Sequence, residues 1–363
     1  LDYFLSKKSN VLKYAGVLFL VLLLFSPFSF AKGIILEDIK ASSNQVKFSG
    51  PAYHQLWQFA GKWARENTPE DSVFIHWWDY GYWVQSGFER ATVTDGGNRI
   101  WWWNYLTARE VLTASQDKDS LKFLYSHNVS YLLIVNEEIG KYPAYSLIGS
   151  DRNYDRYSYI SFMGLDSSQS QETRNGTVLI YSGGYVLDED LIVNNSIYPK
   201  GTFVAGVLVP LENVLDENGN VVSNVIKQPS IVLQHQGGFL QFPMKCVYAD
   251  RLYSFDNYAY GGCIRIIPTV QNNQVNNVGA ILFMSRRVAD TLFARLYLME
   301  QSSDYFELVY NDVANAPLAL YNGGQIGPTK IWKVNYPKGF SVNKTEYEYY
   351  NNLGVDDPTL LEF

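Results

Sequence analysis

The feature that most constrains this chain is an apolar run at residues 14–31, with the sequence YAGVLFLVLLLFSPFSFA. A helix of about 20 mainly apolar residues crosses a bilayer, so the run predicts a transmembrane helix. Lys7, Lys8 and Lys13 precede it, and positive charge is typically retained on the cytoplasmic side. We therefore expect the N-terminus in the cytoplasm and the remaining chain on the extracytoplasmic side of a cell membrane.

A secretory signal peptide is the alternative explanation, because Ser29-Phe30-Ala31 resembles a small-x-small cleavage site. The length of the run and the absence of Met at residue 1 favour the membrane anchor. Both explanations export the bulk of the chain. Asn-x-Ser/Thr sequons agree with that placement. They lie at Asn128, Asn175, Asn194 and Asn343.

The composition excludes several classes of protein. The net charge is −7 and no basic stripe is present, so nucleic acid is not expected as a partner. Cys246 and Cys263 are the only cysteines, too few for a disulfide scaffold, and the four histidines show no zinc spacing with them. The two cysteines could pair in an oxidising compartment, and the sequence leaves a disulfide and two free thiols equally open.

The part of the chain before residue 165 alternates helical and strand patterns. Residues 52–66 carry apolar side chains at helical spacing, and residues 130–135 form the unbroken apolar run of a buried parallel strand. Further strands are expected at 72–77 and 91–95, and further helices at 99–115 and 119–127. This order predicts an α/β core domain over residues 40–165.

The following part has the pattern of strands separated by turns. Strands are expected at 177–181, 202–209, 230–234 and 263–268. Residues 216–220 (DENGN) contain the Asn-Gly pair of a hairpin turn. The fold class is therefore α+β, with four parts. These are a transmembrane helix and flanks at 1–35, the α/β core domain, a β-rich inserted or peripheral unit at 166–280, and a closing helix (286–300) with strands at 281–363.

The most unusual short motif is Trp77-Trp78-Asp79-Tyr80-Gly81. Each indole offers one N–H donor and an ionised Asp only accepts, so together they suit a polar substrate. Gly81 allows the backbone to turn tightly behind them. Packing explains the same residues, with the tryptophans in a core and Asp79 capping the next segment. From the residues alone, both interpretations stay open.

These five residues resemble the WWDYG signature of the catalytic subunit of oligosaccharyltransferase, the membrane enzyme of asparagine-linked glycosylation. The continuation after Gly81 favours an archaeal-like, single-subunit enzyme. The resemblance implies that Trp77, Trp78 and Asp79 bind the Ser/Thr hydroxyl of an Asn-x-Ser/Thr sequon, while Tyr80 and Gly81 shape the turn. Residues 291–298 and 305–310 also resemble the closing part of the family's soluble domain.

A second motif of the same family is expected within residues 137–150. The family pattern has an acidic residue, a lysine one turn later and then an aliphatic residue, and Glu138 and Lys141 resemble its charged pair. The chain departs from the pattern in having Glu for the usual Asp and Tyr145 at the strict aliphatic position, with Ile148 nearby. Without the resemblance, the Gly and Pro in this stretch indicate a solvated loop or irregular helix.

The resemblance also implies a glycosyltransferase reaction, in which a glycan moves from a polyprenyl-phosphate carrier to Asn. The implied partners are an acceptor polypeptide, lipid-linked oligosaccharide and the membrane. The implied cofactor is divalent Mn or Mg, with its ligands and the catalytic carboxylates in an N-terminal half that this chain lacks. We therefore expect this fragment to be inactive alone, and we interpret the acidic triplets at 117–119 and 188–190 as solvated turns or helix starts.

Two other classes of protein remain open. An exported carbohydrate-binding protein would stack its tryptophans on sugar and would bind free glycan without any peptide. A membrane-anchored surface or structural protein would bury these aromatic side chains in a core and would bind no ligand.

Overall fold

The computed structural model describes residues 10–25, 38–44, 53–173 and 175–353. The chain divides into two compact units, residues 1–55 and 56–363. In the first unit, α2 spans Asn10–Phe25 and a short helix spans 38–44. Among the described residues, no helix is both long and apolar enough to cross a membrane. The predicted transmembrane helix is thus not confirmed, and residues 26–31 of the apolar run lie outside the described part.

A five-stranded sheet forms the α/β part of the second unit, in the order β16-β19-β3-β1-β2. Strand β1 runs parallel to β2 and β3, and β19 runs antiparallel to β3. Strand bounds are Val73–Ile75 (β1), Ala91–Thr92 (β2), Val129–Ile134 (β3), Phe306–Asn311 (β16) and Lys330–Val334 (β19). The first three confirm the strands expected from apolar runs. The last two come from the far end of the chain, which closes this sheet.

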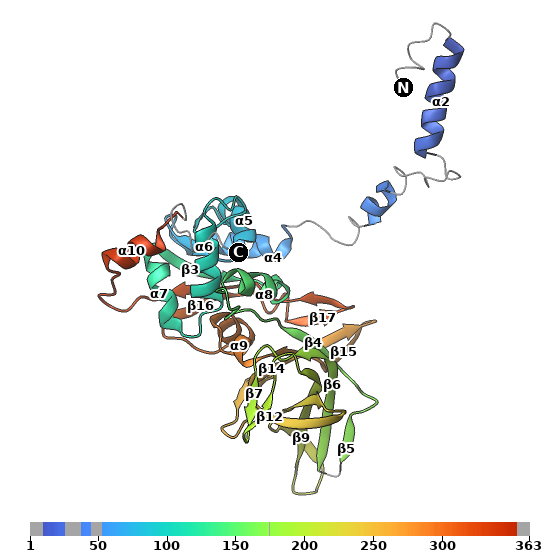
Figure 1. The fold of residues 1–363 in the computed structure, drawn as a ribbon, viewed down its shortest axis with the longest axis vertical. Helices are drawn as coiled ribbons and strands as arrows, with labels where there is room; N and C mark the ends of the chain where they lie inside the picture. Colours follow the sequence, from blue (N-terminus) through green and yellow to red (C-terminus); the bar gives the residue numbers. More distant parts are fainter. Residues whose placement is uncertain (1–9, 26–37, 45–52, 174, 354–363) are drawn as a thin grey trace. The chain divides into compact units, whose positions relative to one another are not determined.

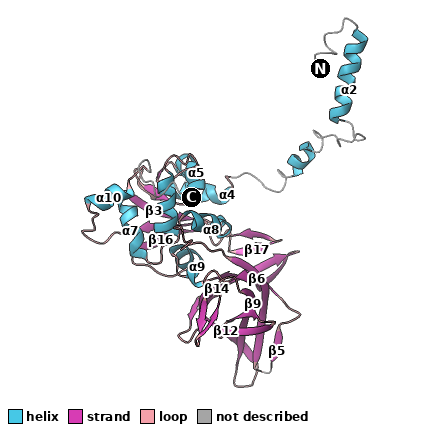
Figure 2. Cartoon of the chain, viewed as in Figure 1, coloured by secondary structure: helices cyan, strands magenta, loops and turns pink. Residues whose placement is uncertain are grey.

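Helices gather around this sheet (Figures 1 and 2). Their bounds are Gln55–Asn67 (α4), Gly81–Trp83 (α5), Val84–Phe88 (η2), Trp101–Leu106 (α6), Thr107–Leu112 (η3), Asp117–Ser126 (α7), Glu137–Ile148 (α8) and Lys344–Tyr350 (α10). Helix α4 buries Trp57, Ala60 and Ala64 on one face. Arg90 is buried at its C-terminal end and donates to the carbonyls of Ala64 and Thr68.

Residues 137–148 form one continuous helix, and not the solvated loop or irregular helix that the Gly and Pro of this segment indicate. Helix α8 contains Pro143 in its interior, which costs one backbone hydrogen bond. Its inner face buries Ile139, Tyr142 and Tyr145. Tertiary packing of an apolar face supplies most of the stability of helices in proteins. The burial of this face therefore outweighs the poor helix propensity of the segment.

A twelve-stranded sheet forms the other part of the second unit, in the order β13-β12-β11-β9-β6-β4-β15-β14-β17-β18. Strand β10 pairs with β9, β5 pairs with β6, and a parallel β12–β14 pairing closes the sheet on itself. The strands from β4 to β11 span Ser161–Leu165 (β4), Gln171–Thr173 (β5), Gly176–Val186 (β6), Leu191–Val193 (β7), Ser196–Tyr198 (β8), Phe203–Leu215 (β9), Val221–Ile226 (β10) and Ser230–His235 (β11). The later strands span Gly238–Tyr248 (β12), Leu252–Ser254 (β13), Tyr260–Gln271 (β14), Gln274–Met284 (β15), Ala319–Tyr321 (β17) and Gly324–Ile326 (β18). Strands β7 and β8 form a separate hairpin.

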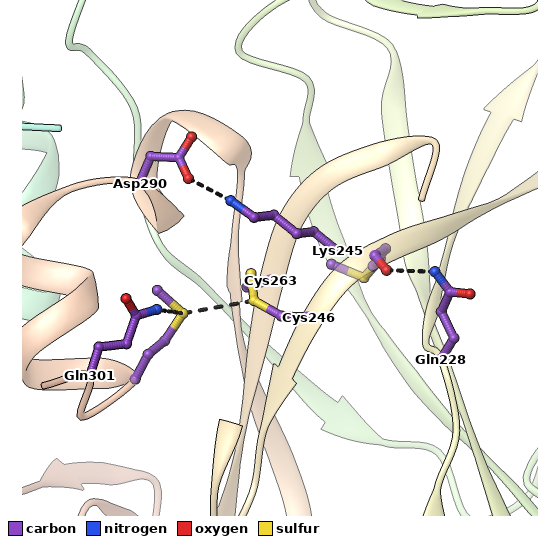
Figure 3. The surroundings of a disulfide bond; sticks show 8 residues. Gln228, Lys245, Cys246, Cys263, Asp290 and Gln301 are labelled. Carbon is purple, nitrogen blue, oxygen red and sulfur yellow. Dashed lines mark hydrogen bonds and ion pairs between the residues drawn. A yellow bond between two sulfur atoms is a disulfide. The ribbon is translucent and has the colours of Figure 1, made fainter. Parts of the chain in front are cut away.

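The interior of the closed sheet is a continuous apolar core. Met163, Val207, Ile231, Ile264 and Phe283 are fully buried in it. A disulfide between β12 and β14 crosslinks the sheet where it closes, with the two cysteine Cα atoms 4.7 Å apart (Figure 3). The sequence left open whether Cys246 and Cys263 pair, and in the structure they form a disulfide.

The sheet extends beyond the β-rich tract expected from the sequence. It begins with β4, before residue 166, and it gains β17 and β18 from the segment assigned to the closing part. Both sheets also lie in one compact unit. The domain boundaries at 165 and 280 therefore stay a prediction.

The helix expected at 286–300 is interrupted. Helix α9 spans only Arg286–Ala289, and a π-helix, η4, spans Ala294–Leu298. The Leu292 N–H donates to the Ala114 carbonyl, 2.7 Å away, so the helical hydrogen-bond ladder is broken at this point. A tertiary contact thus overrides the helical periodicity of the segment.

Candidate functional site

The WWDYG motif lies at the carboxyl end of β1, the second strand from one edge of the five-stranded sheet. Trp77 has extended backbone angles, and Trp78–Tyr80 then form a single 3₁₀ turn, η1. The Tyr80 N–H donates to the Trp77 carbonyl at 3.2 Å, and the Gly81 N–H donates to the Trp78 carbonyl. The five residues therefore make one tight, hydrogen-bonded corner at a strand end, where ligand groups commonly lie in α/β sheets.

The motif divides into buried and accessible side chains. Trp77 and Tyr80 are each 2% exposed, whereas Trp78 and Asp79 are only partly buried. The Tyr80 ring packs against Trp57 at a centroid distance of 5.2 Å, and the Trp77 ring packs against Trp78 at 6.0 Å. Most of the Trp77 and Tyr80 side chains is thus packed in the core, and Trp78 and Asp79 are the more accessible of the four.

Helix α8 brings Lys141 onto the motif. The Lys141 ammonium pairs with Oδ2 of Asp79 and donates to the Tyr80 hydroxyl at 3.1 Å. The same ammonium lies 4.5 Å from the centroid of the Tyr80 ring. One cation therefore holds both the Asp79 carboxylate and the Tyr80 phenol, and the structure places Lys141 of the second motif against the WWDYG motif.

The second carboxylate oxygen of Asp79 has no such partner. Oδ1 is buried and accepts no hydrogen bond from any described residue. Neither indole N–H, of Trp77 or of Trp78, has a hydrogen-bond acceptor in the described part of the chain. A carboxylate oxygen and two N–H donors within three consecutive residues can satisfy a hydroxyl, which both donates and accepts.

Gly81 is required by close packing and not by an unusual backbone angle. Its φ is −55° and its ψ is −46°, which any residue adopts. A Cβ at this position would lie 2.4 Å from the Asp95 Cα and 2.6 Å from the Thr94 carbonyl oxygen. The sequence-based explanation, a turn that needs glycine flexibility, is therefore wrong. The loop after β2 packs directly on the motif, and only a residue without a side chain fits between them.

Glu138 lies in the first turn of α8, with its side chain in the core. It is fully buried, and its Oε2 accepts a hydrogen bond from the Val135 N–H at 2.6 Å. Burial raises the pKa of the Glu138 carboxyl well above its ordinary value, so the neutral acid is favoured. Within the described residues, no hydrogen bond or ion pair links Glu138 to Asp79. The structure therefore brings one half of the expected charged pair, Lys141, to the motif.

Tyr145 and Ile148 differ in environment. Tyr145 is fully buried, with its ring 5.7 Å from the Trp77 ring and 6.0 Å from the Phe293 ring. Ile148, at the end of α8, is 41% exposed. Tyr145 thus supports Trp77 from behind. Phe293 also packs against Tyr145, a contact that the helical pattern of its own segment does not indicate.

The acidic triplet at 188–190 is not a solvated turn throughout. Asp188 is buried, and its Oδ2 accepts hydrogen bonds from the Ser158 and Ser285 hydroxyls, the former at 2.6 Å. Asp117 of the other triplet pairs with Arg295. Both aspartates have partners in distant segments. The triplet at 117–119 is a helix start, as predicted, because Asp117 begins α7. The prediction of a solvated turn is wrong for Asp188.

The potential metal-binding side chains around the site are few. Among the described residues, no group of three or more His, Cys, Asp or Glu side chains could hold a metal ion. At the motif, Asp79 already pairs with a lysine, and the buried Glu138 carboxyl accepts from the Val135 N–H. The side chains described here therefore do not form a site for the divalent ion that the resemblance implies.

Comparisons with known proteins give similarity over part of the chain, and no family model matches it. Dolichyl-phosphooligosaccharide-protein glycotransferase 1 of Pyrococcus furiosus is 35% identical over 95 residues, which is 25% of this chain and 9% of that protein. The dolichyl-diphosphooligosaccharide–protein glycosyltransferase subunit STT3 of Saccharomyces cerevisiae is 34% identical over 73 residues, which is 20% of this chain and 10% of that protein. The matched part thus spans about a tenth of these curated relatives.

Similar solved structures include the Archaeoglobus fulgidus oligosaccharyltransferase tethered with an acceptor peptide containing the NVT sequon. Its TM-score is 0.41 at 13% identity, with coverage of 90% of this chain and 37% of that chain. The Campylobacter jejuni PglB C-terminal domain gives a TM-score of 0.38 at 11% identity, with coverage of 77% of this chain and all of that chain. The curated sequence matches, together with its WWDYG corner, make part of this chain similar to oligosaccharyltransferase catalytic subunits.

Proposed function

We propose that this chain is the acceptor-recognition region of an oligosaccharyltransferase. Such an enzyme transfers a glycan from a polyprenyl-phosphate carrier to the Asn of an Asn-x-Ser/Thr sequon. The observation that carries the proposal is the buried Oδ1 of Asp79, which accepts no hydrogen bond from any described residue. The two preceding residues carry indole N–H groups that also have no acceptor among the described residues. The sequon hydroxyl would donate to this oxygen and accept from an indole, as two donors and one acceptor require.

The ion pair with Lys141 supports this role. It holds Oδ2 of Asp79, so the carboxylate keeps its orientation, with Oδ1 left for a ligand. Hydrogen bonds to a charged partner contribute about 1.5–3 kcal/mol, more than neutral ones. Tyr145 and the 3₁₀ turn fix Trp77 behind the carboxylate. The site is thus preorganised, and binding need not order it.

A site of this kind selects strongly against a peptide that lacks the hydroxyl. Without it, the carboxylate oxygen and the indole donors stay unpaired after the peptide has excluded water. Enzymes that hydrogen-bond a substrate hydroxyl reject the analogue without it by about 10⁴-fold. We therefore propose that Trp77, Trp78 and Asp79 read the third sequon residue and that they do not take part in bond making.

We propose that the catalytic carboxylates, the metal ion and the carrier-binding groove lie outside the described residues. Carboxylates and a divalent Mn or Mg ion would polarise the carrier phosphate. Their ligands, and the groove for the lipid-linked oligosaccharide, are expected in the N-terminal half of the enzyme. The apolar run at 14–31 would anchor the chain in the membrane, with the second unit on the extracytoplasmic side.

Peptide transfer by the intact enzyme in its native membranes tests the proposal. Lipid-linked oligosaccharide is supplied with matched Asn-x-Thr and Asn-x-Ala peptides, for the unchanged enzyme and for Asp79→Ala. We expect transfer to the Thr peptide alone and its collapse in the variant. Asp155→Ala is the matched control, because Asp155 forms a comparable partly buried ion pair with Arg109.

Three outcomes distinguish the functional classes. Transfer to the Ala peptide, or near-normal transfer by Asp79→Ala, would refute hydroxyl recognition. Binding of free glycan that is independent of peptide would favour the carbohydrate-binding alternative. Equal losses in Asp79→Ala and Asp155→Ala would indicate a general effect on folding, which thermal unfolding of both variants would reveal.

A further inference from the structure

His76 follows the last residue of β1 and directly precedes the motif, and nothing in the proposed function uses it. Its side chain is completely buried, and Nδ1 lies 2.7 Å from the Trp77 carbonyl oxygen. Its own carbonyl accepts from the Thr94 hydroxyl at 3.2 Å. The other ring nitrogen, Nε2, is buried and has no hydrogen-bond partner in the described part of the chain. A buried polar ring with one hydrogen-bonded and one unpaired nitrogen, directly before the motif, needs an explanation.

The chemistry of the contact fixes the protonation of the ring. A carbonyl oxygen only accepts, so Nδ1 must carry the proton and donate it. Burial lowers the pKa of His76 to about 4, so the ring is neutral at physiological pH and Nε2 carries no proton. The ring is thus held as one tautomer by the backbone of the residue that follows it.

The Trp77 carbonyl is the point where the turn begins. It accepts from the His76 ring on one side and from the Tyr80 N–H, at 3.2 Å, on the other. These two donors fix the plane of the peptide between Trp77 and Trp78. That plane sets where both indoles and the following carboxylate point. A change in the orientation of this peptide plane would therefore displace both indoles and the carboxylate together.

We propose that His76 is a positioning residue for sequon recognition, which orients the Trp77-Trp78 peptide by donating from Nδ1 to the Trp77 carbonyl. This inference rests on the proposed function, since it names a residue that acts through the same corner. The alternative is a packing role, because the His76 ring also lies 6.3 Å from the Tyr80 ring in an edge-on arrangement. The two roles differ in which replacement restores function.

Asparagine and glutamine separate these roles. The Asn amide nitrogen occupies nearly the place of Nδ1 and can make the same donation, whereas the Gln amide lies one carbon further out, near the place of Nε2. His76→Asn has much less volume than histidine, and His76→Gln matches it better. A packing role therefore favours the Gln variant, and a positioning role favours the Asn variant.

The experiment measures kcat and KM for an Asn-x-Thr peptide in the intact membrane enzyme. We expect kcat/KM of His76→Asn to stay within about twofold of the unchanged enzyme. For His76→Gln we expect a loss of about fivefold or more, the equilibrium factor of one typical net hydrogen bond. The loss should fall mainly on peptide KM, because the corner binds the peptide.

His127 provides the matched control. Its Nδ1 lies 3.1 Å from the Phe123 carbonyl, and its Nε2 is also buried without a partner among the described residues. Its ring packs on Trp103 at 4.7 Å, away from the motif residues. His127→Gln should lower thermal stability and leave peptide kcat/KM unchanged.

The results separate the inference from the proposed function. If the unchanged enzyme treats Thr and Ala peptides alike, the proposed function fails. Suppose instead that the unchanged enzyme discriminates between the Thr and Ala peptides. The positioning role is then overturned if folded His76→Asn loses as much kcat/KM as His76→Gln, or if His76→Gln keeps full kcat/KM. If His76→Gln does not fold, the test rests on folded His76→Asn alone. A peptide KM equal to that of the unchanged enzyme supports the positioning role, and a raised peptide KM refutes it.

Discussion

Replacing Gly81 with alanine tests why the motif ends in glycine. Gly81 has helical backbone angles, and in a helix the change from Gly to Ala ordinarily stabilises by about 1 kcal/mol. Here the new Cβ would lie 2.4 Å from the Asp95 Cα, whereas ordinary contacts begin at 3.4 Å. Backbone must therefore move by about an ångström, and overpacking of this kind costs typically 1–3 kcal/mol.

The obstructing atoms belong to the backbone, so we take the upper end of that range for Gly81→Ala. Subtracting the gain in helix propensity leaves a net loss of about 2 kcal/mol. Gly140 is the matched control, because it lies inside α8 and a Cβ there would have no neighbour within 4 Å. Gly140→Ala should therefore stabilise by about 1 kcal/mol, and the two variants should differ by about 3 kcal/mol.

Denaturant unfolding of the chain measures both free energies, with the glycan-transfer assay beside it. Because Asp79 lies in the turn that the clash displaces, Gly81→Ala should also impair transfer to Asn-x-Thr peptides, whereas Gly140→Ala should not. If Gly81→Ala were as stable as Gly140→Ala, the close approach of Asp95 would not be the reason for the glycine, and the stated packing of the corner would be incorrect.

Four further outcomes follow from the structure and the proposed topology. The folded-state pKa of Glu138 is raised above its ordinary value of 4.5, so its stabilising contribution is complete below that value and is lost as pH rises through the folded pKa. Glu138→Gln should thus raise the free energy of unfolding over the unchanged chain more at pH 8 than at pH 4, and an equal difference at both would contradict the assignment. Cys263→Ser opens a disulfide between cysteines 17 residues apart and should cost about 3 kcal/mol in denaturant unfolding; a variant as stable as the oxidised chain would argue against the crosslink. If Ile148 meets the methyl group of a sequon Thr, Ile148→Ala should erode a preference of about fourfold for Thr over Ser peptides, and an unaltered ratio would place the aliphatic contact elsewhere. A cysteine engineered beside Asn343 should react with an impermeant reagent in intact cells, and labelling only after lysis would reverse the topology.

Local sequence was sufficient for the elements around the site. The apolar run at 130–135 and the short segment at 72–77 predicted two strands, which are β3 and β1. That they pair with one another was seen only in the structure. Helical spacing predicted α4, because its apolar positions recur on one face. The turn at 216–220 lies between β9 and β10, as its Asn-Gly pair indicates. Such features depend on residues a few positions apart, so a single sequence contains them.

The environment of each site residue depended on contacts between distant segments. Lys141 meets Asp79 across 62 positions of sequence, and the Asp95 backbone excludes any side chain at Gly81. No pattern of spacing records such distances. The family resemblance suggested a lysine near the motif, but it did not indicate which oxygen of Asp79 is paired and which is free.

Tertiary structure also reversed several local expectations. Packing of α8 overcame its Gly and Pro, a contact from Ala114 interrupted the helix expected at 286–300, and Asp188 became a buried acceptor for two serines. Propensity differences amount to about 1 kcal/mol per residue for Gly. Burying a large apolar side chain contributes about 1.5–3 kcal/mol. Where local propensity and core packing favour different conformations, core packing therefore decides, because its contribution to the free energy is larger.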